Sequence, residues 1–273
     1  MKLSFNTWCY CSFPAWLPAY PIDYVIRSLG KIGYDGIELG CASPVAYPPY
    51  MTAADRQKVR EMLKANKIEI SSVLPAPGGG CGNNVASPIE AERKTAVQSY
   101  KDCVDLVADL GGKICLYVAG WVIYGVAQDQ GWEWSRQCLV EVAAHAKKRG
   151  VIIAVEPTPS DSNLVETPDD ALKLMRETKA DNVKVMFDTI HALYRKDIPA
   201  DYVEKIGSDL AHVHISDLER MPPGTFSDFT FLVDALKANG YNGYLAMEIG
   251  LGGRGVDANV FAKKSLEYMR KIL

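Results

Sequence analysis

Short apolar runs alternate with longer amphipathic segments along most of the chain. The runs are rich in β-branched and aromatic residues, and sequences such as VIIAV and KICLYV are almost continuously apolar. Such runs are typical of parallel strands that are covered on both faces. We expect eight strands, at Leu3–Thr7, Gly36–Leu39, Ile68–Val73, Lys113–Val118, Val151–Glu156, Val183–Phe187, Leu210–Ile215 and Tyr244–Glu248.

The segments between these runs are predicted to be helices. Two of them carry explicit start signals, since Ser87 and Thr167 each precede a proline and an acidic first turn. Gly150 and Gly240 follow two other segments and indicate helix ends. The expected helices are Ile22–Ile32, Thr52–Ala65, Pro88–Leu110, Trp132–Arg149, Pro168–Thr178, Pro199–Ile206, Asp228–Asn239 and Asp257–Leu273.

The number of strand–helix units predicts the fold class. Eight β-α units in 273 residues favour a closed (β/α)8 barrel of the α/β class over an open doubly wound sheet. The first helix is not opened by G-x-G-x-x-G, which argues against a dinucleotide-binding sheet. A barrel of this kind uses about 250 residues as one domain. We therefore expect a single barrel domain over residues 1–273.

The composition and net charge limit the classes of binding partner that we expect. The chain is 48% hydrophobic and 23% charged, with a net charge of −3, so disorder and a broad basic face for nucleic acid are both disfavoured. No apolar run approaches the ~18 residues of a membrane helix, and we identify no signal peptide. The seven cysteines are scattered without a CxxC pair, as in a reduced cytoplasmic protein. We expect a cytoplasmic protein with a small-molecule partner and no membrane or nucleic-acid partner.

Four successive strands are predicted to end in residues that can bind a metal: Glu156, Asp188, His214 and Glu248. Reacting groups of such barrels lie at the C-terminal ends of the strands. One carboxylate there is most often a cap or a salt-bridge partner, but three buried together would cost several kcal/mol per ion without compensation. A divalent cation compensates them. The ligand set favours Mn²⁺, with Mg²⁺ or Co²⁺ as alternatives and Zn²⁺ less favoured.

Further candidates lie near these four. His191 and Arg220 are expected on loops above the rim, where His191 can donate to a substrate oxygen. Arg220 can clamp hydroxyls or an anion, or it can be a solvated loop charge. Glu38 ends the second strand and is a candidate for contacts with substrate hydroxyls. His212 is expected to point to the other side of the strand from His214, either as a core histidine or as one that contacts a site residue from behind.

Aromatic residues and a glycine-rich segment fall on the predicted loops. The aromatic residues form either a wall for the C–H side of a sugar or a hydrophobic cover. The segment from Pro75 to Gly82 is interpreted as a lid or a plain loop. The aromatic candidates are Trp8, Tyr10, Phe13, Trp16, Trp121 and Tyr124.

The segments AVEPTPS, MFDTIH, HVHISD and LAMEI resemble the sugar phosphate isomerase/epimerase family, the xylose isomerase-like barrels. Within it the chain is most similar to the ketose 3-epimerases, such as the tagatose and psicose 3-epimerases. The resemblance implies four metal ligands, at Glu156, Asp188, His214 and Glu248. It also implies Glu156 and Glu248 as acid/base residues, His191 and Arg220 as substrate-binding residues, and a homodimer or homotetramer.

The resemblance implies a metal-dependent sugar epimerase. A proton next to a carbonyl would be removed and returned through a metal-stabilised enediolate, with Glu156 and Glu248 on its two faces. One position departs from the family pattern. The epimerases place a second substrate-contacting Glu six residues after the first ligand, where this chain has Ser162. The identity of the sugar is therefore open.

Three alternatives stay open beside the epimerase. A lyase of the same superfamily, similar to inosose or 3-dehydroshikimate dehydratases or to 3-keto-glycoside deglycosidases, begins with the same proton removal and then expels a leaving group. A nuclease similar to AP endonuclease IV is less favoured, because it needs more histidines than the four present, of which the first is His145. A non-enzymatic sugar-binding or scaffolding barrel would leave the four rim residues without a metal.

Overall fold

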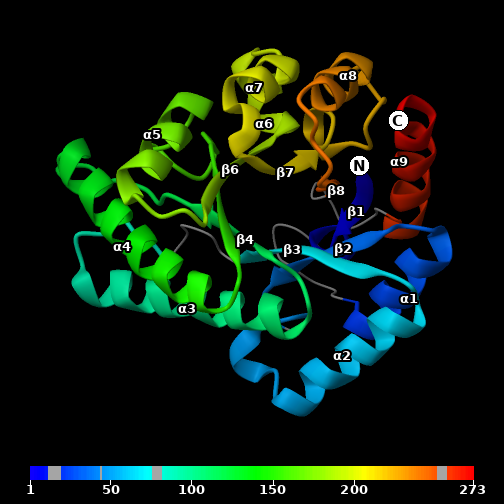
Figure 1. Ribbon diagram of the computed structural model, residues 1–273, viewed down its shortest axis with the longest axis horizontal. Coiled ribbons are helices and arrows are strands. Elements are labelled where there is room, and N and C mark those ends of the chain that lie inside the picture. Colours follow the sequence, from blue (N-terminus) through cyan, green and yellow to red (C-terminus); the bar gives the residue numbers. More distant parts are fainter. Residues whose placement is uncertain (12–19, 44, 76–81, 251–256) are drawn as a thin grey trace.

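The structure is a computed structural model that describes residues 1–11, 20–43, 45–75, 82–250 and 257–273. Within these ranges, eight parallel strands pair in chain order and close into one barrel through the pairing of β8 with β1. Figure 1 shows this ring of strands at the centre of the molecule. The strands are β1 Lys2–Asn6, β2 Gly36–Cys41, β3 Glu69–Pro75, β4 Ile114–Val118, β5 Ile152–Glu156, β6 Val183–Asp188, β7 Leu210–Ile215 and β8 Tyr244–Met247.

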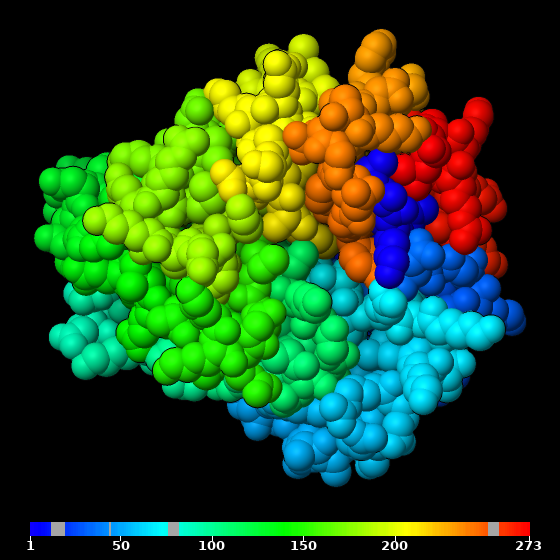
Figure 2. Space-filling model, viewed as in Figure 1, coloured from blue at the N-terminus to red at the C-terminus, as the bar shows by residue number. Residues whose placement is uncertain are grey.

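The helices surround the ring of strands. On the outer surface α3, α4 and α5 follow one another, and α1 lies between α2 and α9; Figure 2 shows these regions in greens and, for α1 and α9, in blue next to red. The expected α/β barrel is confirmed. In the described part of the chain, none of the helices has the length and apolar character to cross a bilayer. The helices are α1 Ile22–Ile32, α2 Ala53–Ala65, α3 Glu90–Asp109, α4 Gln128–Lys148, α5 Pro168–Thr178, α6 Thr189–Arg195, α7 Pro199–Ile206, α8 Thr230–Ala238 and α9 Ala258–Ile272.

The helix starts follow the local signals only in part. Thr167 caps α5 as predicted, in a capping box with Asp170. Ser87 does not cap α3, because its hydroxyl accepts the backbone N–H of Ile89, which lies before the helix. The helix begins at Glu90, two residues after the expected Pro88. Helix α4 begins at Gln128, before the expected Trp132. A proline therefore located the turn before α3 but not the first residue of the helix.

Helix α6 was not expected from the sequence. It begins directly after β6, because the Asp188 carboxylate accepts the backbone N–H of Ile190 at 3.0 Å and acts as the N-cap. His191 therefore lies in the first turn of a helix and not on a loop, so the expected loop position was wrong. The helix fixes the direction of the His191 side chain more firmly than a loop would.

The two faces of the barrel have different contents. The outward side chains join one large apolar core under the helices. Inside, a small apolar cluster of Leu116, Ala154 and Met186 lies on β4, β5 and β6. Strands β1, β2, β3 and β7 carry buried polar residues, among which Glu38 and His214 are fully buried. A barrel interior is normally filled by branched apolar side chains, so this polar cluster indicates function.

Two sequence predictions fall outside the described residues. Phe13 and Trp16 belong to the segment 12–19, and the glycine-rich loop includes residues 76–81. The other members of the predicted aromatic wall lie in the described part of the chain.

Candidate metal centre and active site

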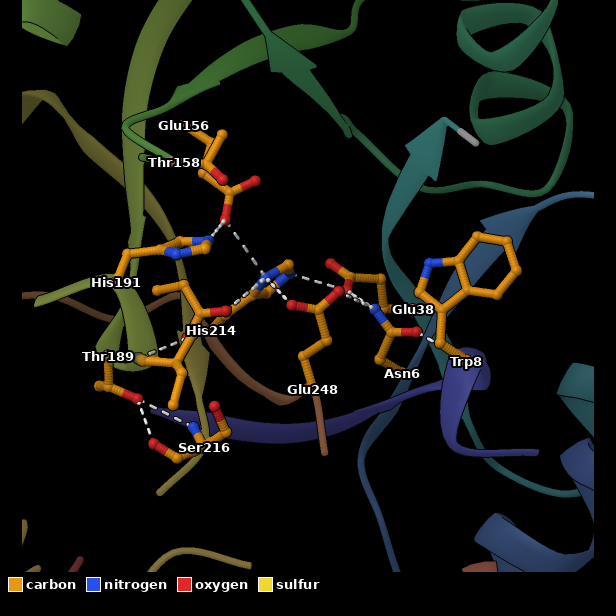
Figure 3. A network of polar contacts seen from close by, with 12 residues as sticks. Asn6, Trp8, Glu38, Glu156, Thr158, Thr189, His191, His214, Ser216 and Glu248 are labelled. Atoms are coloured by element: carbon orange, nitrogen blue, oxygen red, sulfur yellow. Dashed lines mark hydrogen bonds and ion pairs between the residues drawn. The ribbon is translucent and has the colours of Figure 1, made fainter. Parts of the chain in front are cut away.

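The four predicted ligands converge at one end of the barrel. Asp188 ends β6 and pairs in register with His214 of β7, while Glu156 ends β5 and Glu248 follows β8 directly. All four side chains are buried. The three carboxylates lie at the ends of three different strands. Figure 3 shows Glu156 and Glu248 reaching the His214 ring from different sides. Barrel closure thus brings together residues that lie far apart in the sequence.

The Nδ1 atom of His214 lies at the centre of this group. It is 3.2 Å from Glu248 Oε2, 3.8 Å from Asp188 Oδ2 and 3.9 Å from Glu156 Oε1. This buried nitrogen has no hydrogen-bond partner. Ligand atoms of Asp188, His214 and Glu248 lie within 4.8 Å of one another, the spacing of a metal-binding group. Three carboxylate oxygens around an unpartnered imidazole nitrogen fit a hard or borderline divalent cation.

The carboxylates differ in their electrostatic environments. Burial raises the pKa of Glu156 well above its usual value, and the neighbouring Glu248 and Asp188 carboxylates raise it further, against the lowering by His214. Burial also opposes ionisation of Asp188, but the Arg220 guanidinium and the two nearby histidines outweigh it and lower its pKa. Glu156 therefore holds a proton more readily than Asp188 when no cation is bound.

Arg220 points into the carboxylate cluster. Its guanidinium hydrogen-bonds Asp188 and lies 2.8 Å from Glu248 Oε2 and 3.4 Å from Ser216 Oγ. Only 20% of the side chain is exposed. The alternative of a solvated loop charge is therefore ruled out by the structure.

A short 3-10 turn, Leu218–Arg220, places that guanidinium. Glu219 and Arg220 both have positive φ, 58° and 55°, a conformation that costs non-glycine residues energy. Asp217 holds the turn from outside, since its carboxylate accepts the backbone N–H groups of Phe226 and Ser227 at 2.7 and 2.9 Å. Strain of this kind is found where a side chain must be aimed at a site.

His191 lies over Glu156. Its Nε2 is 3.7 Å from Glu156 Oε1, and its buried Nδ1 has no hydrogen-bond partner. Burial lowers the pKa of His191, against the opposing effect of Asp188, so the neutral imidazole is favoured. A neutral ring has one N–H to donate and one nitrogen to accept, which suits a sugar hydroxyl.

Glu38 does not face the open end of the site. Its side chain is fully buried, and both oxygens are engaged, by His212 Nε2 and His214 Nε2 at 2.8 Å each. The expected contact with substrate hydroxyls gains no support, because neither oxygen is free. The expected direction of His212 was wrong, since residues two apart on a strand share a face. The alternative that His212 contacts a site residue from behind agrees with its hydrogen bond to Glu38.

The aromatic candidates are mostly structural. Tyr10 packs in an aromatic cluster with Tyr20 and Tyr24 on the outer side of the barrel. Trp8 is buried, and its Cε2 would lie 2.5 Å from a Cβ added at Gly40. Tyr124 is fully exposed and Trp121 is 43% exposed, so a continuous wall is not formed by the described members of the group.

Ser162 stands where the family places a carboxylate. Its hydroxyl donates to the Gly120 carbonyl at 2.7 Å and accepts the backbone N–H groups of Leu164 and Val165. It therefore joins the loops after β4 and β5 and is fully buried. It presents no charge to a substrate.

Sequence reasoning missed two polar residues of the site, Asn6 and Ser72. The Asn6 amide donates to Glu38 at 2.6 Å and reaches Glu248 Oε1 at 3.4 Å, and the Ser72 hydroxyl donates to Glu38. Asn6 is the last residue of β1. The rule that identified Glu156 and Asp188, inspection of strand ends, would have found it if applied to the first strand.

The family model of the xylose isomerase-like TIM barrel matches residues 26–272. The chain belongs to this family. The match includes all four predicted ligands and seven of the eight strands that the structure describes.

The chain is similar to several curated proteins and solved structures that are named as epimerases. Fructoselysine 3-epimerase of Shigella flexneri is 24% identical over 260 residues, covering 93% of this chain and 94% of the relative. D-Psicose 3-epimerase of Ruminiclostridium cellulolyticum is 28% identical over 242 residues, covering 84% and 79%. The crystal structure of D-psicose 3-epimerase with D-tagatose from Clostridium cellulolyticum superposes with a TM-score of 0.84 at 23% identity, covering 100% and 99%. These comparisons place the chain among isomerase and epimerase enzymes.

Proposed function

We propose that the chain is a metal-dependent epimerase of a keto-sugar, of the ketose 3-epimerase type. The observation that carries the proposal is the convergence of three buried carboxylates on the unpartnered Nδ1 of His214. The relatives support the same class, because two of them are named as 3-epimerases of sugars. The substrate is proposed to be a small sugar with a carbonyl next to the carbon that inverts.

Glu156, Asp188, His214 and Glu248 would hold the ion. Their donor set is three carboxylates and one imidazole nitrogen, which favours Mn²⁺, with Mg²⁺ or Co²⁺ as alternatives. When bound, such a cation supplies Lewis-acid polarisation of the sugar carbonyl and stabilises the negative charge that develops on its oxygen. The chain's own residues account for the other steps.

Glu156 and Glu248 act as the base and the acid. They reach the site from the ends of β5 and β8, on different sides of His214 (Figure 3). One carboxylate removes the proton from the carbon, and the other returns a proton to the opposite face of the planar intermediate, so that the centre is inverted.

Arg220 and His191 orient the sugar. The Arg220 guanidinium presents charged N–H donors beside Glu248, where a developing oxyanion or a hydroxyl would be held. His191 donates or accepts a single hydrogen bond next to Glu156. Both groups are largely buried, which excludes bulk water and strengthens their polar contacts.

Hydrogen exchange with solvent tests the proposal. The Mn²⁺-loaded protein is incubated in D₂O with a panel of ketoses, ketose phosphates and 3-keto glycosides, and deuterium in the sugars is measured by NMR and mass spectrometry. We expect deuterium at one carbon, with loss of about 100-fold or more in the exchange rate for Glu156→Gln and for Glu248→Gln. Glu61→Gln, which changes an exposed carboxylate on α2, is the matched control.

The metal content of each variant is measured in parallel, so that loss of the ion is separated from loss of the proton-transfer group. Full exchange in both Gln variants would refute the assignment, as would the absence of exchange with every sugar by the metal-loaded protein. Product mass separates an epimerase from the lyase alternative. An epimerase gives a stereoisomer of equal mass apart from deuterium, whereas a lyase gives an alkene or a released aglycone.

A further inference from the structure

A fully buried carboxylate, Glu38, lies beneath the proposed metal centre and is not part of it. Four side chains contact its two oxygens: His212 Nε2 and His214 Nε2 at 2.8 Å, Asn6 Nδ2 at 2.6 Å, and the Ser72 hydroxyl. The Asn6 amide is oriented by its own network, because its oxygen accepts the Trp8 backbone N–H at 2.8 Å. Figure 3 shows Glu38 and Asn6 on the side of His214 away from Glu156.

The barrel register creates this arrangement. Asn6, Glu38 and Ser72 are direct register partners on β1, β2 and β3, so that the three side chains lie in one row. The register between β2 and β3 shifts between Ile37 and Glu38, an irregularity that often re-aims a side chain near a functional site. The two histidines come from β7, 174 positions along the chain from Glu38 to His212.

Packing alone does not explain a charge at this position. Barrel interiors are usually filled by branched apolar side chains, and a buried carboxylate costs several kcal/mol unless its partners compensate for lost hydration. Here the four partners compensate the Glu38 carboxylate for its lost hydration, but an apolar residue would fill the same space and need no partners. The carboxylate acts on His214, whose ring lies between Glu38 and the carboxylate cluster.

We infer that Glu38 is a positioning residue that orients His214 for metal binding, an inference that rests on the proposed function. A neutral imidazole carries its proton on one nitrogen and a lone pair on the other. The Glu38 carboxylate lies at ion-pair distance from His214, with Oε1 2.8 Å from Nε2, and its negative charge favours a proton on that nitrogen. The lone pair of Nδ1 is then directed at Glu156, Asp188 and Glu248, where it can bind a cation held by these carboxylates.

A second ion held by Glu38, His212 and His214 is the competing interpretation. The three residues offer ligand atoms within 4.8 Å of one another. However, the Asn6 amide and the Ser72 hydroxyl both donate to the same carboxylate, and an amide N–H cannot ligate a metal. The geometry therefore favours a hydrogen-bonded anion, with one ion per chain at the cluster around Nδ1.

Metal affinity of the Glu38→Gln variant tests the inference without measuring activity. The variant keeps the shape of the side chain but turns an N–H₂ group toward one histidine, which must then rotate or move its proton. We expect Mn²⁺ affinity, measured by calorimetric titration of the metal-free protein, to fall about 10- to 100-fold. Glu69→Gln is the matched control, because Glu69 is an exposed carboxylate at the start of β3 that pairs with Lys2.

The melting temperature of the metal-free variant distinguishes positioning from a structural role. A positioning role predicts weaker Mn²⁺ binding with little change in the melting temperature, whereas a structural role predicts a lower melting temperature with unchanged affinity. If Glu38→Gln does not fold, Glu38→Asp carries the test, because it keeps the charge but withdraws it from His214 by one methylene. Affinity of Glu38→Asp within about twofold of wild type would overturn the inference.

The outcomes separate this inference from the proposed function. Equal Mn²⁺ affinity of wild type and folded Glu38→Gln would overturn the role of Glu38 and leave the metal-dependent epimerase standing. A wild-type protein that binds no divalent ion would overturn both. A stoichiometry of two ions per chain that falls to one in Glu38→Gln would also overturn it, in favour of the second ion.

Discussion

Arg220 and the proposed divalent cation would compete for the same carboxylates. The guanidinium contacts Asp188 and Glu248, two of the four residues proposed to hold the ion. Two cations next to each other repel, so under the proposed function Arg220 would lower the metal affinity while it supplies donors for the sugar. The proposal therefore gives Arg220 opposite effects on sugar binding and on metal binding.

Replacement of Arg220 by Met separates these two effects. We expect Arg220→Met to raise KM for the sugar about tenfold or more, because charge-assisted hydrogen bonds contribute about 1.5–3 kcal/mol. Mn²⁺ affinity should be unchanged or higher, since a neighbouring positive charge is removed. Steady-state kinetics and calorimetric titration measure the two quantities, with Arg195→Met on α6 as the control, where Arg195 pairs with Asp197. Unchanged KM with weaker Mn²⁺ binding would contradict the assignment.

At the scale of the elements, one residue links site and fold. Asp188 ends β6, caps α6 and contributes to the carboxylate cluster, so strand, helix and site share one side chain. The start of α6 could be explained only once the Asp188 side chain was placed, because its carboxylate can accept a backbone N–H or face the barrel. By contrast, the sequence predicted the start of α5 from Thr167, the following proline and the acidic first turn, and the structure adds a capping box between Thr167 and Asp170.

Asp109 joins three helices on the outside of the barrel. Its carboxylate pairs with Arg56 of α2 at 2.6 Å and with Arg149 at the end of α4 at 2.5 Å. Burial opposes ionisation, but the hydrogen bonds from the two guanidinium groups lower the pKa of Asp109 below its ordinary value. A lowered folded-state pKa means that the stabilisation is present above the unfolded pKa and is lost as the pH falls through the folded pKa.

Asp109→Asn should therefore destabilise the protein at neutral pH but not in acid. We expect a loss of about 1 kcal/mol at pH 7, because the half-exposed pairs are screened by solvent. The difference should shrink once the pH falls below about 3.9, the ordinary pKa of aspartate. Urea unfolding over a pH series measures it, with Asp181→Asn, an exposed single pair with Lys147, as the control. A difference that does not vary with pH would show that packing, not charge, is responsible.

At the scale of the whole molecule, ion binding is expected to stabilise the barrel. The proposed ligands come from β5, β6, β7 and the end of β8, so an ion would connect half of the strands that the structure describes. A ligand that binds only the folded state adds stability in proportion to the logarithm of its concentration. The predicted cytoplasmic location and the homodimer or homotetramer stay predictions.

Mn²⁺ at about 100 times its Kd should add about 2.7 kcal/mol to the stability. For a chain of this size that corresponds to a rise of about 5–10 °C in Tm. Scanning calorimetry with and without a chelator measures the rise, and Asp188→Asn should abolish most of it. Equal Tm values for wild type with and without the chelator would contradict the proposed centre.

The sequence by itself determined the barrel and the four converging residues. Strand and helix periodicities are local properties, and Glu156, Asp188, His214 and Glu248 could be found because each ends or follows a strand that the pattern identifies. Closure of a parallel barrel then requires all strand ends to meet at one rim, so their proximity followed without knowledge of a single contact.

The tertiary structure alone decided how the site is supported. The pairing of Glu38 with His214, the aim of Arg220 and the start of α6 depend on strand register, on a strained turn and on a side chain shared between strand and helix. None of these is a property of a short segment. Contacts across the barrel are fixed by how far each strand slides along its neighbour, and the periodicity of one strand contains no information about that shift.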